Sequence, residues 1–269
     1  MANIKAHLFK SGINYDIDYA LILETATVNG FTKPSDDQKD IQNQLIIDLK
    51  GVGLWSKLDS FHVFATDGDL GFAYIDWKRK EVATDSGTGT IRQNINLSVD
   101  QNGGGKRIDT GYNPDADKVS LTLNSASFGF KISGTSNVST DDNQCGSSID
   151  GLSQPLGANW LYGSSFGCKF YINNTTAGGF GNTFRNINNE ADGFYSVTRD
   201  TNDCRLYKNA VLQSTITNSP ELISSLNHSY LKGVQITKIQ YGFVGGYLTT
   251  TELGLLEGLM SDYLADILL

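Results

Sequence analysis

Three aspartates stand close together in the stretch FATDGDLGFAYIDW at residues 64–77: Asp67, Asp69 and Asp76. Carboxylates so spaced could ligate calcium, act as acid and base on a sugar, or make a turn. A calcium loop of the helix–loop–helix kind needs a longer Asp-x-Asp-x-Asp-Gly run and a distant Glu. Asp67-Gly68 between apolar runs predicts a tight hairpin turn, with a weak calcium site as the alternative. Asp76 falls on a predicted strand, where we expect it to face solvent or a partner.

Other residues that could carry chemistry lack the required context. Ser165 lies in a Gly-x-Ser-x-Gly run, but between two strand-like segments rather than on a strand-to-helix elbow. His7, His62 and His228 are not spaced as zinc ligands, and the acids of 113–117 have the same ambiguity as the first group. No strand carries the Glu-x-Asp-x-Glu pattern of lectin-like glucanases. The sequence therefore predicts a protein that is not an enzyme, with no metal site and no cofactor.

Aromatic and amide side chains gather between residues 158 and 195, as carbohydrate binding would require. The candidate ligand-binding residues are Trp160, Tyr162, Asn173 and Tyr195. The alternative is that these rings alternate into the core, where large apolar side chains normally lie.

The composition excludes several classes of function. The 269 residues include 21 basic and 29 acidic side chains, which gives a net charge of −8 and argues against nucleic-acid binding. The N-terminal run MANIKAHLFKSG lacks the apolar segment of a signal peptide, and no window is long enough to insert into a membrane. Cys145, Cys168 and Cys204 match neither a zinc nor a disulfide pattern and are expected to be small core residues. We expect synthesis in a reducing cytoplasm without a signal peptide.

Three predicted helices frame the chain. Residues 16–30 and 35–51 form an αα-hairpin, with Asp16 and Ser35 as N-caps. Residues 249–269 form a third helix with one apolar stripe. This helix either packs on the β-structure or lies in an oligomer seam.

Short β-rich runs fill the middle of the chain. The predicted strands are 61–65, 72–77, 118–123, 128–133, 158–163, 168–173, 193–199, 204–209, 211–216 and 239–248. Such spacing, with glycine-rich turns between the runs, predicts a β-sandwich. The basic run KRK at 78–80 is expected to be a solvated strand end. We divide the chain into an arm with a helical hairpin (1–54), a jelly-roll sandwich (55–248) and a C-terminal helix (249–269).

Several segments of the sequence are distinctive when they are taken together. They are the segments 34–68, 72–78, 108–117, 122–132, 194–215 and 241–265. Together they resemble virion proteins of bacteriophages that infect flavobacterial and Bacteroides-type hosts, over most of the chain from about Tyr15. The resemblance implies a laminin-G or concanavalin A-like lectin jelly roll, as in phage tail, fibre and capsid-surface proteins. It implies no catalytic residues.

One hairpin departs from the pattern of that family. Its members tend to read Leu-Tyr-Lys-Asn-Gly-Val, where Asn-Gly favours a type I′ turn. Residues 206–211 read LYKNAV, with Ala210 in the place of the glycine. The tightness of this turn is therefore open.

The resemblance and the absence of catalytic patterns lead to one functional expectation. The chain is expected to be a phage virion structural protein, exposed on tail or capsid, whose lectin-like sandwich adheres to host-surface glycans. One alternative is a decoration or connector protein that binds only other virion proteins, and another is a polysaccharide depolymerase. We expect a homo-oligomer, with residues 1–15 as an arm that anchors the protein to the virion or to a neighbouring subunit.

Overall fold

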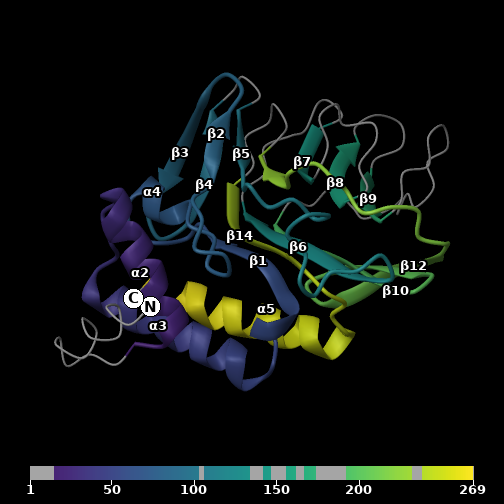
Figure 1. Cartoon of the computed structure of the whole chain (residues 1–269), viewed down its shortest axis with the longest axis horizontal. Helices are drawn as coiled ribbons and strands as arrows, with labels where there is room; N and C mark the ends of the chain where they lie inside the picture. Colours follow the sequence, from purple (N-terminus) through teal and green to yellow (C-terminus); the bar gives the residue numbers. More distant parts are fainter. Residues whose placement is uncertain are drawn as a thin grey trace.

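The protein builds two antiparallel β-sheets and a layer of helices (Figure 1). The computed structural model describes residues 15–102, 106–133, 142–146, 156–161, 167–173, 192–231 and 238–268, with the backbone alone at 101–102, 142–146, 156–161 and 167–171. Within these ranges, no helix combines the length and the apolar character needed to cross a membrane.

The N-terminal helical hairpin forms as predicted. Helix α2 (Ile17–Asn29) begins at Asp16, whose side chain accepts from the Asp18 amide, and ends at Gly30 in the left-handed conformation with φ of 71°. Helix α3 (Asp36–Gly51) begins at Ser35, whose hydroxyl accepts from the Gln38 amide. The short 3-10 helix η1 (Trp55–Lys57) then leads into the first strand.

The larger sheet has eight strands. They are β1 (Leu58–Val63), β3 (Thr90–Asn94), β4 (Ser98–Asn102), β6 (Ser125–Ser133), β10 (Gly193–Asp200), β11 (Asp203–Lys208), β12 (Val211–Thr217) and β14 (Lys238–Gly245). Their order is β12-β11-β10-β6-β14-β4-β3, and β1 also pairs with β14. Strand β14 pairs with β6 along one edge and with β4 and then β1 along the other.

The smaller sheet has six strands in the order β2-β5-β13-β7-β8-β9. They are β2 (Thr84–Ser86), β5 (Arg107–Asp109), β7 (Asp142–Gly146), β8 (Leu156–Leu161), β9 (Gly167–Ile172) and β13 (Ser229–Tyr230). Strands β2 to β5, β7 and β13 were not predicted, because their short polar sequences show little hydrophobic alternation.

Two hydrophobic cores lie on the two faces of the larger sheet. The sheet core fills the space between the sheets and includes Phe128 and Phe130 of β6. The helix core lies between the larger sheet and the helices, and includes Phe243 of β14. A register shift between Ile239 and Tyr241 places Ile239 in the sheet core and Tyr241 in the helix core. The fold is thus mainly β, a jelly-roll sandwich with one helix-covered face, as predicted.

The C-terminal helix α5 (Thr250–Asp266) completes the helix core. It begins with a full capping box between Thr249 and Glu252. The apolar stripe of α5 is buried: Leu253, Leu256, Met260 and Tyr263. The helix runs beside α3 under the larger sheet (Figure 1). Of the two alternatives for this stripe, the structure therefore shows packing within the chain.

A chain of hydrogen bonds ties the helices to the start of the β-structure. The Tyr19 hydroxyl donates to Oε1 of Gln42 at 2.9 Å, and Nε2 of Gln42 donates to Oγ1 of Thr66 at 3.1 Å and to the Tyr263 hydroxyl at 3.3 Å. The Tyr263 hydroxyl donates onward to the Ala65 carbonyl at 2.6 Å. Three helices and one loop are thereby locked together inside the helix core.

The β11–β12 hairpin is tight despite its alanine. Asn209 and Ala210 have φ of 50° and 55°, and Lys208 pairs directly with Val211. Positive φ at both central residues is what a type I′ turn requires. Ala210 therefore adopts a left-handed conformation that a glycine would adopt without strain.

Candidate functional site

The first two aspartates of the 64–77 stretch hold the helical hairpin in place. The Ser35 amide donates to both carboxylate oxygens of Asp67, at 3.1 and 3.2 Å. Asp69 accepts from the Thr32 amide at 2.7 Å and caps the short helix α4 (Leu70–Ala73) through the Phe72 amide at 2.9 Å. The predicted Asp67-Gly68 hairpin is wrong, because Asp69 starts a helix instead of a returning strand.

Asp76 is fully buried, so the prediction that it faces solvent or a partner is wrong. Its carboxylate accepts from the Ser60 hydroxyl at 2.6 Å and from the amides of Phe61, Lys78 and Arg79 at 3.1, 2.9 and 3.2 Å. The predicted strand at 72–77 is also wrong, since its first two residues belong to α4 and Ile75 and Asp76 form only isolated bridges. With four donors around it, this carboxylate fixes the turn at 78–80 against β1.

Asp59 has a similar buried, structural role. It is 4% exposed and accepts from the amides of Val119, Ser120 and Leu121 at 3.1, 2.7 and 2.8 Å. The Tyr112 hydroxyl donates to the same carboxylate at 3.2 Å. The predicted strand at 118–123 is absent, because three successive amides are turned toward one carboxylate instead of a neighbouring strand.

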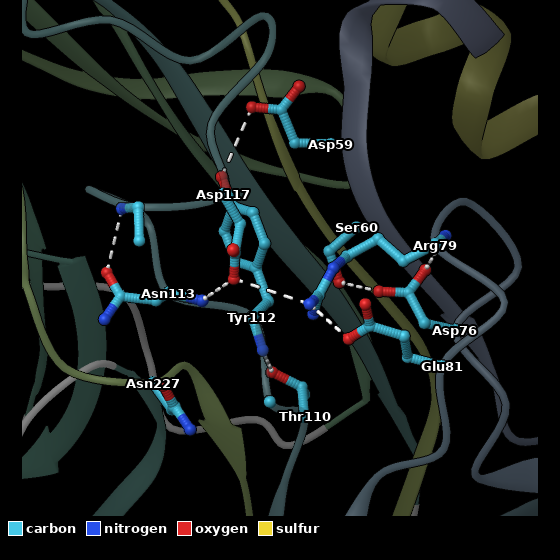
Figure 2. A network of polar contacts seen from close by, with 12 residues as sticks. Asp59, Ser60, Asp76, Arg79, Glu81, Thr110, Tyr112, Asn113, Asp117 and Asn227 are labelled. Carbon is cyan, nitrogen blue, oxygen red and sulfur yellow. Dashed lines mark hydrogen bonds and ion pairs between the residues drawn. The ribbon is translucent and has the colours of Figure 1, made fainter.

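Arg79 is the centre of the polar network drawn in Figure 2. Its Nη2 pairs with Glu81 and lies 3.4 Å from Asp117, and the guanidinium carbon lies 5.6 Å from the centre of the Tyr112 ring. The Asn113 amide donates to Asp117 at 2.8 Å. Nη1 of Arg79 is buried and has no hydrogen-bond partner in the described part of the chain. Arg79 therefore keeps unused donor capacity.

The two lysines of the KRK run also fold back onto the protein. Nζ of Lys78 donates to the Trp55 carbonyl at 2.6 Å and lies 4.6 Å from the centre of the Trp55 ring. Lys80 pairs with Asp18 and has φ of 60°. The predicted solvated strand end is wrong: the run is a turn whose side chains are packed against α2 and η1.

A surface hollow of about 440 Å³ opens beside this turn. Its lining residues are Leu21, Glu24, Thr25, Val28, Asn29, Arg79 and Lys80. Val28 is 75% exposed, and Glu24 and Asn29 are also exposed. The hollow combines an apolar strip, carboxylate and amide oxygens and two cations, a set of groups that can hydrogen-bond a polyhydroxy ligand and pack against its apolar face. The basic run at 78–80 next to Asp76 is the signal that could have pointed here, but it was expected to be a solvated strand end.

Two of the four candidate ligand-binding residues are core residues. The Tyr195 ring is fully buried and stacks on Phe130 with centroids 6.1 Å apart. Asn173 is 1% exposed, and its Nδ2 donates to the carbonyls of Thr122 and Leu123, both at 2.9 Å. Neither side chain is available at the surface, so the prediction of a ligand contact does not hold for this pair. The core alternative describes them instead.

The remaining predicted site residues are only partly described. Trp160 lies in β8, where its backbone pairs with Asp142 and Cys168, and its side chain lies outside the described atoms. Tyr162, Ser165 and His7 fall outside the described residues. Of the cysteines, only Cys204 has a described side chain, and it is buried as expected.

The histidines with described side chains do not form a metal site. His62 is fully buried, its two ring nitrogens have no hydrogen-bond partner among the described residues, and burial lowers its pKa. His228 is also buried and meets the Tyr230 ring edge-on, with centroids 4.9 Å apart. Within the described ranges no group of three His, Cys, Asp or Glu side chains could hold a metal ion.

Comparison with known proteins gives similarity of fold. No protein-family model and no curated protein matches the sequence. Domain 4 of AbnA, a GH43 extracellular arabinanase from Geobacillus stearothermophilus solved in complex with arabinotriose, is similar with a TM-score of 0.53 and 16% identity, over 75% of this chain and 98% of that domain. A mutant of Trypanosoma rangeli sialidase with trans-sialidase activity is similar with a TM-score of 0.56 and 10% identity, over 84% of this chain. The chain spans 39% of the length of that sialidase.

Proposed function

We propose that this protein is a glycan-binding module of a bacteriophage virion, exposed on tail or capsid, and that the hollow beside Arg79 contributes to binding. The single observation that carries glycan binding is the hollow itself, where hydrogen-bonding groups and an apolar strip meet on a rigid turn. The sandwich fold supports it, because a domain of similar fold was solved with arabinotriose. The virion part rests on the sequence resemblance and is tested separately.

Binding rather than catalysis is proposed because the buried carboxylates are fully committed. Asp59 and Asp76 each accept four hydrogen bonds, which leaves little room for a reacting substrate. Glu81 and Asp117 are held on one nitrogen of Arg79. Release of reducing ends from a bound polysaccharide would replace this proposal with a depolymerase.

The hollow is tested with a glycan array and variants of the exposed face of α2. Glu24→Ala should weaken binding of the recognised glycan about tenfold, since a hydrogen bond to a charged group contributes roughly 1.5 kcal/mol or more. Val28→Ser should weaken it less, by loss of apolar contact. Thr27→Ala is the matched control, because Thr27 is exposed on the same helix but does not line the hollow.

Each outcome of this experiment has a distinct interpretation. A glycan bound equally by all variants would move the site away from the hollow and keep the function. Failure to bind any glycan would remove the function and favour the connector alternative. Mass spectrometry of purified phage particles tests the virion part, and absence of the protein from them would overturn it. Light scattering tests the proposed homo-oligomer, and the mass of a single chain would count against it.

A further inference from the structure

A second surface feature lies between two helices and shares no lining residue with the hollow beside Arg79. A groove of about 280 Å³ runs between α3 and α5. It is lined by Asp40, Ile41, Gln44, Leu45, Asp48, Leu259, Asp262, Tyr263 and Asp266. The floor is apolar, because Leu45 and Tyr263 are buried and Ile41 and Leu259 are half-buried.

Four carboxylates rim this groove, and no lysine or arginine is among the described residues that line it. In the described part of the chain none of the four forms an ion pair, and only Asp48 accepts a side-chain hydrogen bond, from Gln44 at 2.8 Å. By contrast, Asp16 and Asp18 in the same helical layer are paired with Lys50. The groove is therefore a concentration of uncompensated negative charge.

The positions of these acids are electrostatically unfavourable as they stand. Asp262 and Asp266 are four residues apart on one helix face, where like charges repel. Both lie toward the C-terminal end of α5, whose partial charge is negative and whose last turn has no basic residue. A cationic group seated in the groove would relieve both effects at once.

The first fourteen residues of the chain have the complementary chemistry. They include Lys5, Lys10 and His7 and no acidic residue, with apolar side chains at Ile4 and Leu8 among others. The cationic occupant of the groove therefore need not come from another protein. The chain as a whole has a net charge of −8, so this basic, acid-free segment is opposite in sign to the protein that it joins.

The described chain begins next to the groove. The Asp16 amide donates to Oδ1 of Asn43 in α3 at 2.7 Å. Partial burial, followed by the charges of Asp40 and Asp36, raises the pKa of Tyr15. Asp40 is a groove residue, so the segment joins the protein at the end of α3 where the groove starts. Fourteen residues can extend to about 46 Å, whereas the groove follows α3 for only about 12 Å, the rise over eight helical residues.

We propose that the groove between α3 and α5 is the docking site of residues 1–14 of the same chain, with the lysines against the aspartates and the apolar side chains on the floor. The segment is thereby stored on the helical layer and shields the acids. This goes beyond glycan binding and depends on neither the hollow nor the virion assignment.

Zero-length carbodiimide cross-linking of the full-length protein tests the contact. The reagent joins a lysine amine to a carboxylate as an amide with loss of water, so it reports direct ion pairs. Mass spectrometry should find Lys5 or Lys10 joined to Asp40, Asp48, Asp262 or Asp266. Cross-links to carboxylates outside the groove, or none from these lysines, would overturn the proposal.

An equal mixture of isotope-labelled and unlabelled protein distinguishes the same chain from a neighbouring copy. Docking within one chain gives cross-linked peptides that are wholly labelled or wholly unlabelled. Mixed pairs would overturn docking in the same chain and assign the segment to a second copy.

Limited trypsin digestion gives an independent measure of the same contact. Cleavage after Lys5 and Lys10 should be at least fivefold faster in the double variant Asp48→Asn, Asp262→Asn than in the unaltered protein, because the groove loses two charges. Asp37→Asn is the matched control, since Asp37 is an exposed acid of α3 outside the groove. Equal cleavage rates in all three proteins would contradict the proposal.

Discussion

The helix core and the end of the sheet core around β13 differ in how they accommodate buried polar side chains. In the helix core, Gln42 is satisfied by Tyr19, Thr66 and Tyr263. At that end of the sheet core, His62 stacks on Phe64 with centroids 5.6 Å apart and meets Tyr230 edge-on at 5.8 Å, without a hydrogen-bond partner for either ring nitrogen in the described structure.

This difference shows what each region gains from its polar residues. A satisfied network stabilises one arrangement of helices, because every alternative leaves donors unpaired. An unsatisfied buried imidazole contributes packing but disfavours its own charged form. Hydrogen bonds should therefore determine how the helix core packs, and its stability should not change in mild acid. The His62 region should be held by packing alone, and its stability should fall in mild acid.

Asp76 joins the turn at 78–80 to β1, and its loss should have the largest effect. Asp76→Ala leaves three backbone amides and one hydroxyl without an acceptor and should lower the free energy of unfolding by about 3 kcal/mol or more. Urea denaturation followed by both tryptophan fluorescence and circular dichroism measures it. Trp55 and Trp77 report on the helix core, and circular dichroism reports on all elements.

The coincidence of these two signals sharpens the comparison. If one carboxylate supports both cores, the two transitions should coincide in the variant as in the unaltered protein. Separate transitions would show that the cores unfold independently. Asp76→Asn is the control, because it keeps an oxygen acceptor and should cost less.

His62 should make the protein lose stability in mild acid. Burial, opposed by Asp76 and assisted by Arg79, lowers its folded-state pKa below the ordinary histidine value of 6.5. The unfolded state therefore binds a proton that the folded state refuses, and stability present above pH 6.5 falls as the pH drops below it, by at most about 1.4 kcal/mol per pH unit. The neighbouring residues His228 and Tyr230 are left unchanged in the variant that tests this prediction.

Urea denaturation between pH 7.5 and pH 5.5 measures this slope. His62→Phe should flatten it, because the stacked aromatic contact is kept and the titrating group is lost. Gln42→Leu in the helix core serves as the contrast: it should lower stability at every pH without changing the slope. An unchanged slope in His62→Phe would contradict the prediction.

A smaller effect is expected at the edge of the larger sheet. Ala210→Gly removes a left-handed alanine from the β11–β12 turn and should raise the free energy of unfolding by about 1 kcal/mol. Thermal melting measures it. Ala116→Gly is the control, since Ala116 lies in an exposed loop without a positive φ and should be neutral or slightly destabilising.

The smallest effect is expected for the aspartates that hold the helical hairpin. The double variant Asp67→Asn, Asp69→Asn should lose less than about 1 kcal/mol, because asparagine also accepts from backbone amides and caps helices. Calcium should not change the melting temperature of either protein. A large calcium-dependent rise that disappears in the double variant would reveal a metal site.

The sequence predicts the parts of this fold that local chemistry decides. The caps Asp16, Ser35 and Thr249 and the stripe of α5 are local signals, and each of the three predicted helices forms where expected. The strands β6, β10 and β11 carry aromatic and branched residues and were also predicted. The tight turn at residues 209–210 forms at the place of the Asn-Gly pattern, although Ala210 stands there instead of the glycine.

The sequence does not reveal which carboxylates are buried, because their donors come from distant segments. Asp59 meets amides about sixty residues away, and the Asp76 position looked like strand alternation in FAYIDW. The Arg79 hollow combines α2 with a turn fifty residues later. Tyr195 and Asn173 could not be distinguished from surface residues by composition, since burial depends on which face of a strand is covered.

The pairing of β1 with β14 has a consequence during synthesis on the ribosome. Leu58 is paired with Gly245, and Tyr263 of the last helix bonds to Ala65. The helical hairpin emerges first and can pack on Phe61, Phe72 and Trp77 soon afterwards, but the rest of its apolar face is covered only when the final strand and helix leave the exit tunnel. At about 5–20 residues per second, the roughly two hundred intervening residues take ten seconds or more to translate. The helix core stays incomplete for that time, so only a finished chain can close it.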